Sequence, residues 1–119
     1  DIELMDRAIQ NSDIFGYRAS FLKDKSREQD GKSYAGAAAV AKVAASETAL
    51  VVTNKCIEMC GAHGIFSGQL NDARNNVDIC VIGEGPNKLL KRHVIPRLAN
   101  DEWRRYLQHH EEVLSRILF

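Results

Sequence analysis

Hydrophobic residues recur at helical spacing along much of the chain. Between residues 2 and 25 the apolar positions are mostly three or four residues apart, as on one face of an α-helix. Residues 34–59 form a second apolar stretch rich in alanine, and Gly61 or Gly64 suits the left-handed turn that commonly ends a helix. The pattern predicts two long helices, 2–25 and 34–59, joined by a charged connection that contains the turn-forming pair Asp30-Gly31.

The C-terminal part of the chain predicts two further helices. Pro86 suits the first turn of a helix over residues 86–98, in which Pro96 is expected to introduce a kink or mark the last turn. Asn100 predicts the N-cap of a final helix, because its side-chain oxygen can accept a hydrogen bond from a backbone N–H of the first turn. The final helix has one broad apolar face, made of Trp103, Tyr106, Leu107, His110, Val113, Leu114 and Ile117.

Residues 72–82 are ambiguous. Their β-branched content would suit a strand, but a lone strand has no partner elsewhere in this sequence, so we expect a short helix or an extended turn. The whole chain is expected to be a single all-α domain, 1–119. Its predicted architecture is an antiparallel up-and-down helical bundle, with lengthwise packing of residues 2–25, 34–59 and 86–98.

Charge and cysteine content narrow the range of partners. The 119 residues contain 16 basic and 16 acidic side chains, and this balance argues against nucleic acid or an anionic membrane surface. No uninterrupted apolar run approaches the roughly 20 residues that span a bilayer, so we expect no membrane segment. No signal-peptide pattern opens the chain. Three cysteines in this context indicate free thiols in a cytoplasmic or other reducing compartment.

One cluster of residues resembles a set of metal ligands. Cys56, Cys60 and His63 are four and three residues apart, which places them on one side of a helix. Structural zinc takes four ligands, and no second pair lies at a matching distance in this sequence. We therefore expect buried thiols and a loop histidine, and no metal site.

Candidate chemistry centres on Glu84, a carboxylate between two glycines. An apolar run ends at Gly83, and the next predicted helix begins just after Gly85. Apolar surroundings raise the pKa of a carboxyl group, whereas water and a helix N-terminus lower it, so this position suits a general base. The alternative is a carboxylate that only caps the following helix.

Five short motifs lie in order along the chain: AGAAAVAK at 35–42, ASETA at 45–49, CIEMCGAHG at 56–64, NDAR at 71–74 and GEGP at 83–86. In this order they resemble the C-terminal helical domain of the acyl-CoA dehydrogenase family. That family shows an alanine-rich helix with A-K-x-x-A-S-E-x-A, a Q-x-x-G-G-x-G turn, an R-D-A-[RK] segment and an E-G-T-x-x-I helix start. The resemblance runs from about Asp1 to Asn100.

The resemblance implies a catalytic role for Glu84. In this family a glutamate removes the α-proton of an acyl-CoA thioester while the β-hydrogen passes as hydride to the flavin of FAD, and Glu84 matches that glutamate. The backbone N–H of the same residue is implied to bind the thioester carbonyl and stabilise the developing enolate. Dehydrogenases of this kind use an electron-transfer flavoprotein as their electron acceptor.

Cofactor contacts are implied at two places. The turn that contains Glu58, Gly61 and Gly64 would contact the FAD of a neighbouring subunit, so a homo-oligomer, either a dimer or a tetramer, is expected. Gly85 and Asn87 would lie near the adenosine part of the cofactor. A chain of this length cannot enclose both FAD and an acyl thioester. We therefore expect an excised piece of a longer flavoenzyme, which alone is inactive and does not retain FAD.

Several departures from the family pattern favour other functions. Glu58 stands where the family has glutamine, Ala62 replaces the second glycine of the turn, and Asn71 replaces arginine. Pro86 replaces the threonine after Glu-Gly, and the spacing from Asp72 to Glu84 is about one helical turn longer than usual. These departures favour a non-catalytic helical oligomerisation module as the main alternative. An acyl-CoA oxidase-like relative is the other.

Overall fold

The computed structural model describes residues 2–28, 34–66, 68–83 and 85–118, and the regular elements within these ranges are all helical. The all-α prediction is therefore confirmed. The long helices are α1 (Ile2–Glu28), α2 (Tyr34–Cys60), α4 (Gly68–Ile82) and α7 (Asp101–Leu118). The shorter elements are α3 (Ala62–Phe66), α5 (Asn87–Leu89), the π-helical turn η1 (Leu90–Val94) and α6 (Ile95–Leu98).

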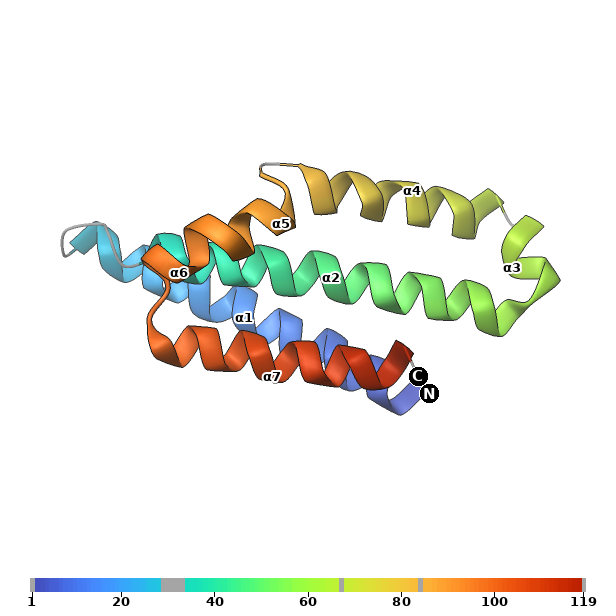
Figure 1. The fold of residues 1–119 in the computed structure, drawn as a ribbon, viewed down its shortest axis with the longest axis horizontal. Coiled ribbons are helices and arrows are strands. Elements are labelled where there is room, and N and C mark those ends of the chain that lie inside the picture. Colours follow the sequence, from blue (N-terminus) through green and yellow to red (C-terminus); the bar gives the residue numbers. More distant parts are fainter. Residues whose placement is uncertain (1, 29–33, 67, 84, 119) are drawn as a thin grey trace.

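The helices form an elongated bundle of 52 × 24 × 24 Å (Figure 1). Helices α1 and α7 both run lengthwise beside α2, whose C-terminal end extends beyond them, and α4 packs against another side of α2. The chain runs one way in α1, back in α2, the first way again through α4 to α6, and back in α7. This alternation confirms the predicted up-and-down topology, although the third pass is divided between α4 and the short helices that follow it.

The lengthwise partners of α2 differ from the expectation in one respect. The third lengthwise helix is α7, whereas residues 87–98 lie only along the N-terminal half of α2. The physical reason is length. Twelve helical residues extend about 18 Å, against about 40 Å for the 27 residues of α2.

The ambiguous segment 72–82 lies in a regular helix. Helix α4 spans 15 residues, longer than the short helix or turn expected, and none of its described residues is buried. Val77 and Val81 are half-buried, whereas Ile79 and Ile82 are exposed, and the packing of α4 against α2 overrides a weak strand preference. This helix therefore packs on one side only.

Helix ends follow the predicted signals. Gly61 ends α2 with a φ of 59°, the left-handed conformation expected at a helix C-terminus. The Trp103 backbone N–H donates to the Asn100 side-chain oxygen over 3.0 Å, which confirms Asn100 as the N-cap of α7. Pro96 lies in the first turn of α6, directly after the π-helical turn η1. The proline thus accompanies a local irregularity, as a kink-forming residue is expected to do.

The core consists of two buried clusters at the two ends of the α1–α2–α7 bundle. One cluster contains Phe15, Ala37, Val40, Val43, Trp103 and Leu107, among others. The other contains Met5, Ala8, Val113, Leu114 and Ile117. The predicted apolar face of the last helix is confirmed, except that Tyr106 is 36% exposed at its edge.

Helix α2 is also the one described helix that is long and apolar enough to cross a membrane. Lys42 and Glu47 interrupt its apolar sequence, and half of the most apolar stretch is buried inside the bundle. The central helix of a globular bundle has a similarly apolar composition, because neighbouring helices cover it on several sides.

His110 of α7 is almost fully buried, at 1% exposure, beside α2. The Thr48 hydroxyl donates to the carbonyl of Ala44 over 2.7 Å, so it accepts from His110 Nε2–H across 2.6 Å. The other ring nitrogen, Nδ1, has no partner among the described residues. Because burial disfavours the charged ring, the pKa of His110 lies below its ordinary value of 6.5.

This buried histidine predicts a pH-dependent stability. The unfolded chain takes up a proton near pH 6.5, whereas folded His110 resists protonation, so the stability it contributes is complete above pH 6.5 and falls as the pH drops below it. We expect the free energy of unfolding, measured in urea, to decrease between about pH 7.5 and about pH 5. His110→Gln should flatten this slope, because glutamine has no proton to gain. A slope in His110→Gln equal to that of the parent would contradict the assignment.

Candidate functional site

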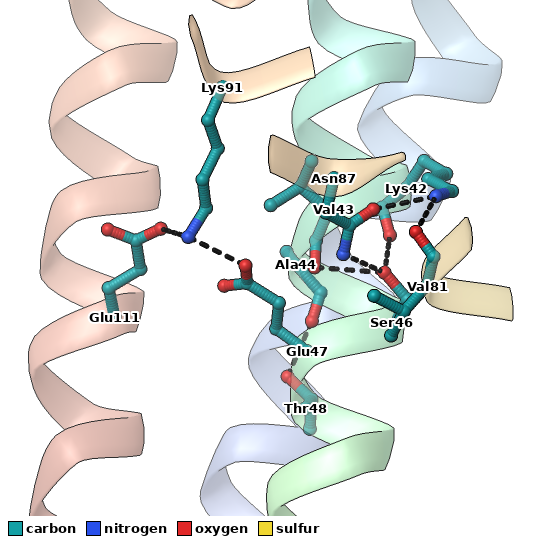
Figure 2. Close-up of polar contacts among 10 residues, drawn as sticks. All are labelled: Lys42, Val43, Ala44, Ser46, Glu47, Thr48, Val81, Asn87, Lys91 and Glu111. Carbon is teal, nitrogen blue, oxygen red and sulfur yellow. Dashed lines mark hydrogen bonds and ion pairs between the residues drawn. The ribbon is translucent and has the colours of Figure 1, made fainter. Parts of the chain in front are cut away.

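The side chain of Lys42, on α2, joins three points of the chain on both sides of position 84. Figure 2 shows two of these contacts, to Val81 and Asn87. Its ammonium group donates to the carbonyl of Val81 over 3.1 Å and to the carbonyl of Gly85 over 3.0 Å. It also donates to the side-chain oxygen of Asn87 over 2.6 Å. The helix end at α4 and the start of α5 are thereby tied to the same point on α2.

Asn87 extends this contact into a network. Its side chain is buried, at 4% exposure, and its amide nitrogen donates to the Ser46 hydroxyl over 2.7 Å. The same hydroxyl donates to the backbone carbonyl of Lys42, one helical turn earlier, over 2.7 Å. Both polar ends of Asn87 are therefore satisfied inside the protein, as buried polar groups generally are.

A second set of contacts fixes the π-helical turn η1. Lys91 in η1 lies 2.6 Å from a carboxylate oxygen of Glu47 on α2 and 2.7 Å from one of Glu111 on α7 (Figure 2). Burial by itself would lower the pKa of Lys91, but the hydrogen bonds to Glu111 and Glu47 outweigh it and raise the pKa above 10.5. Lys91 therefore stays charged and links three helical elements.

Glu84 itself lies outside the described residues, and its two glycine neighbours define the place. The Gly83 N–H donates to the carbonyl of Ile79 over 2.7 Å, as the last turn of α4 closes. Gly85 has a φ of 103°, a conformation that side-chain-bearing residues rarely adopt. The predicted glycine flank thus coincides with the junction between α4 and α5.

An apolar groove of about 480 Å³ opens beside this turn. Its walls come from α2 and α4, and its lining residues are Lys42, Ala45, Ser46, Ala49, Ile79, Cys80 and Gly83. The small alanine side chains on α2 leave this space open, whereas Ile79 is 67% exposed on the facing helix. Gly83, the described residue that precedes Glu84 in the chain, therefore borders an apolar surface.

The predicted cofactor-binding residues fall into two separate places. Glu58, Gly61 and Gly64 lie at the C-terminal end of α2 and in α3, about 24 Å along the helix from Lys42. Gly85 and Asn87 lie at the Lys42 network. A single protomer does not bring the two groups together, which is the separation expected if one group contacts a ligand held by a neighbouring subunit.

The glycine turn fits a cofactor only in part. Gly61 exposes its backbone in a left-handed conformation, which suits close approach by a flat or neutral group. Gly64 is buried, and an added Cβ would collide with the backbone of Ile57, so packing alone requires this glycine. The Glu58 carboxylate is 71% exposed and pairs with Lys55 over 3.3 Å. Its charge does not fit beside a pyrophosphate.

The three thiols are unpaired, as expected, but the expectation that they are buried is wrong. Cys60 and Cys80 are exposed, and Cys56 is half-buried. Cys56 packs against the buried cluster of Met5, Ala8, Val113, Leu114 and Ile117, and Cys80 lines the groove between α2 and α4. Within the described part of the chain, no group of three or more His, Cys, Asp or Glu side chains is placed to hold a metal ion.

No role was predicted from the sequence for Lys42, Ser46 and Glu47. All three belong to the alanine-rich motif, and each contacts the segment between Val81 and Lys91. The available signal was three polar side chains at spacings of four and one within the otherwise apolar stretch 35–47. Such side chains have to find partners when the helix is buried.

Comparison with known proteins gave one match. A model of the family described as "Acyl-CoA dehydrogenase, C-terminal domain" matches residues 3–99. Comparisons with curated proteins and with solved structures gave no significant match. The matched residues include α1, α2, α4 and the whole Lys42 network. The chain belongs to the acyl-CoA dehydrogenase C-terminal domain family.

Proposed function

We propose that this chain is the C-terminal part of a longer FAD-dependent flavoenzyme that introduces an α,β double bond into acyl-CoA thioesters. The observation that carries the proposal is the position of the Gly83–Gly85 turn. Contacts from Lys42 hold its two sides, and an apolar groove opens beside it. This arrangement suits a carboxylate that works on an apolar substrate.

In the proposed reaction the two carbon–hydrogen bonds at the α and β positions break and a carbon–carbon double bond forms. Glu84 takes the α-hydrogen as a proton, and its carboxylate becomes neutral. FAD, when bound, accepts the β-hydrogen with its electron pair. The backbone N–H of Glu84 stabilises the negative charge that develops on the thioester oxygen, since such a donor is most effective where charge appears in the transition state.

The proposal also includes a homo-oligomer with shared cofactor sites. Residues 58–64 lie far from the Lys42 network, so a flavin that contacts these residues would be bound mainly by a partner subunit. Helix α1 exposes Ile14, Tyr17 and Phe21, which are 46%, 76% and 59% accessible, and this apolar face suits contact with other protein. Electron transfer to a separate flavoprotein and residence in a reducing compartment, consistent with three unpaired thiols, complete the proposal.

The test uses the full-length protein under anaerobic conditions. Acyl-CoA thioesters of several chain lengths are added, and the flavin absorbance is followed. Bleaching by acyl-CoA, and not by free coenzyme A or a free fatty acid, supports dehydrogenation. Admission of oxygen then separates the two enzyme classes, because rapid reoxidation indicates an oxidase-like relative and slow reoxidation indicates a dehydrogenase.

A non-catalytic oligomerisation module is the second candidate, and two observations favour it. The exposed carboxylate of Glu58 stands at the proposed cofactor turn, and the side chain of Asn87 is fully engaged within the protein. A full-length protein that forms oligomers but contains no flavin, and takes up none when FAD is added, would support this candidate.

A further inference from the structure

Lys42 reaches the chain on both sides of Glu84. A lysine ammonium has three N–H donors, and here all three are used, by the carbonyls of Val81 and Gly85 and by the side-chain oxygen of Asn87. These acceptors lie 39, 43 and 45 residues away in the sequence. This one side chain therefore connects the last turn of α4 to the residues around the start of α5.

The three acceptors are all neutral, and they have different origins. Val81 contributes a carbonyl from the last turn of α4, where helical partners run out. Gly85 contributes a carbonyl from a residue in a left-handed conformation, and Asn87 is buried at the start of α5. Hydrogen bonds from a charged donor are stronger than neutral ones, so this contact is a firm restraint on the turn.

We propose that Lys42 is a positioning residue for the proposed base, because its contacts hold Val81, Gly85 and Asn87, which lie on both sides of Glu84 in the chain. The catalytic consequence rests on the proposed function, whereas the restraint on Val81, Gly85 and Asn87 does not. A general base has to lie within hydrogen-bond reach of the proton it removes, and a displacement of about 1 Å can cost roughly a hundredfold in rate. Lys42 acts through the backbone and has no role in proton transfer.

The identity of the residue follows from the geometry. An ammonium group directs its donors toward three separate acceptors, whereas the planar guanidinium of arginine is suited to two parallel acceptors. Methionine keeps the unbranched apolar stem, which lines the groove, and removes all three donors. Lys42→Met therefore isolates the hydrogen bonds, and Lys42→Arg retains the charge with poorer geometry.

The test compares Lys42→Met, Lys42→Arg and Lys91→Met in the full-length protein. Lys91→Met is the matched control, since it removes another lysine that joins α2 to the C-terminal half of the chain without removing a contact to residues 81–87. For each variant, hydrogen–deuterium exchange is measured on peptides that cover residues 82–87. Flavin reduction by a fixed acyl-CoA is measured in a single turnover, together with the dissociation constant of that thioester.

In Lys42→Met we expect faster exchange at residues 82–87 and flavin reduction slower by about 10- to 100-fold, with the dissociation constant nearly unchanged. Lys42→Arg should recover part of both losses, and it takes the place of Lys42→Met if the latter does not fold. Lys91→Met should lower thermal stability while exchange at 82–87 and flavin reduction stay close to those of the parent.

The outcomes separate the two proposals. Parent-like exchange at residues 82–87 in Lys42→Met overturns the positioning role, and so does a parent-like rate of flavin reduction when Glu84→Gln is slow. If the parent shows no flavin reduction while exchange in Lys42→Met rises, the proposed function fails and the restraint by Lys42 stands.

Discussion

Replacing Glu84 by glutamine in the full-length protein is expected to slow flavin reduction by acyl-CoA about a hundredfold or more, the usual contribution of a general base. Glutamine keeps the size of the side chain and some of its hydrogen bonding but cannot accept the α-proton. The contacts of Lys42 to Gly85 and Asn87 involve no atom of the replaced side chain. FAD content, folding and acyl-CoA binding should therefore be preserved.

The matched control is Glu112→Gln, which makes the same chemical change at an exposed position of α7. It should leave flavin reduction unchanged. If Glu84 only caps a helix, its replacement costs about 0.3–1 kcal/mol of stability and leaves the rate nearly unaltered. A Glu84→Gln protein that bleaches as fast as the parent would therefore rule out Glu84 as the base.

Gly36→Ala is expected to have the largest effect on stability. An added Cβ at Gly36 would collide with the backbone carbonyl of Leu98 and the nitrogen of Ala99, so α2 and the end of α6 would have to separate. Overpacking of this kind costs about 1–3 kcal/mol, and backbone atoms cannot rotate away as a side chain can. We expect the free energy of unfolding, measured in urea, to decrease by about 1–3 kcal/mol.

Gly16→Ala provides the opposite outcome from the same change. Gly16 lies in the exposed interior of α1, and no atom outside its local helix lies within 4 Å of an added Cβ. Alanine is favoured over glycine within a helix by about 0.5–1 kcal/mol, so this variant should be more stable than the parent. Similar losses of stability in the two variants would show that close packing at Gly36 is not the cause.

Local sequence signals were sufficient for most helices. The apolar spacing of residues 2–25 and 101–117 reports which side of each helix is buried, and Gly61 and Asn100 report where helices end or begin. Residues 72–82 were harder because their β-branched residues prefer strands in isolation, and only packing against α2 decides in favour of a helix. The arrangement of α7 along α2 likewise depends on contacts between distant parts of the chain.

Local sequence signals predicted one part of the candidate site and not the other. Glu84 was recognisable because two glycines flank it at the end of an apolar run, whereas the positive φ of Gly85 was not predicted. The Lys42 contacts were beyond reach, since they join residues 39 or more positions apart. Asn87 was predicted near a cofactor, and its side chain has structural partners in Lys42 and Ser46, so the cofactor contact stays a prediction.

Helix α7 lies beyond the residues that match the family, which end at position 99. It nevertheless supplies Trp103 and Leu107 to one buried cluster and Val113, Leu114 and Ile117 to the other. The family match therefore covers fewer residues than the packed bundle needs, because α1 and α2 stay covered only when α7 is present as well. A relative without this last helix has to cover the same sides of α1 and α2 with other protein segments. We therefore expect members of the family to differ in shape on these sides.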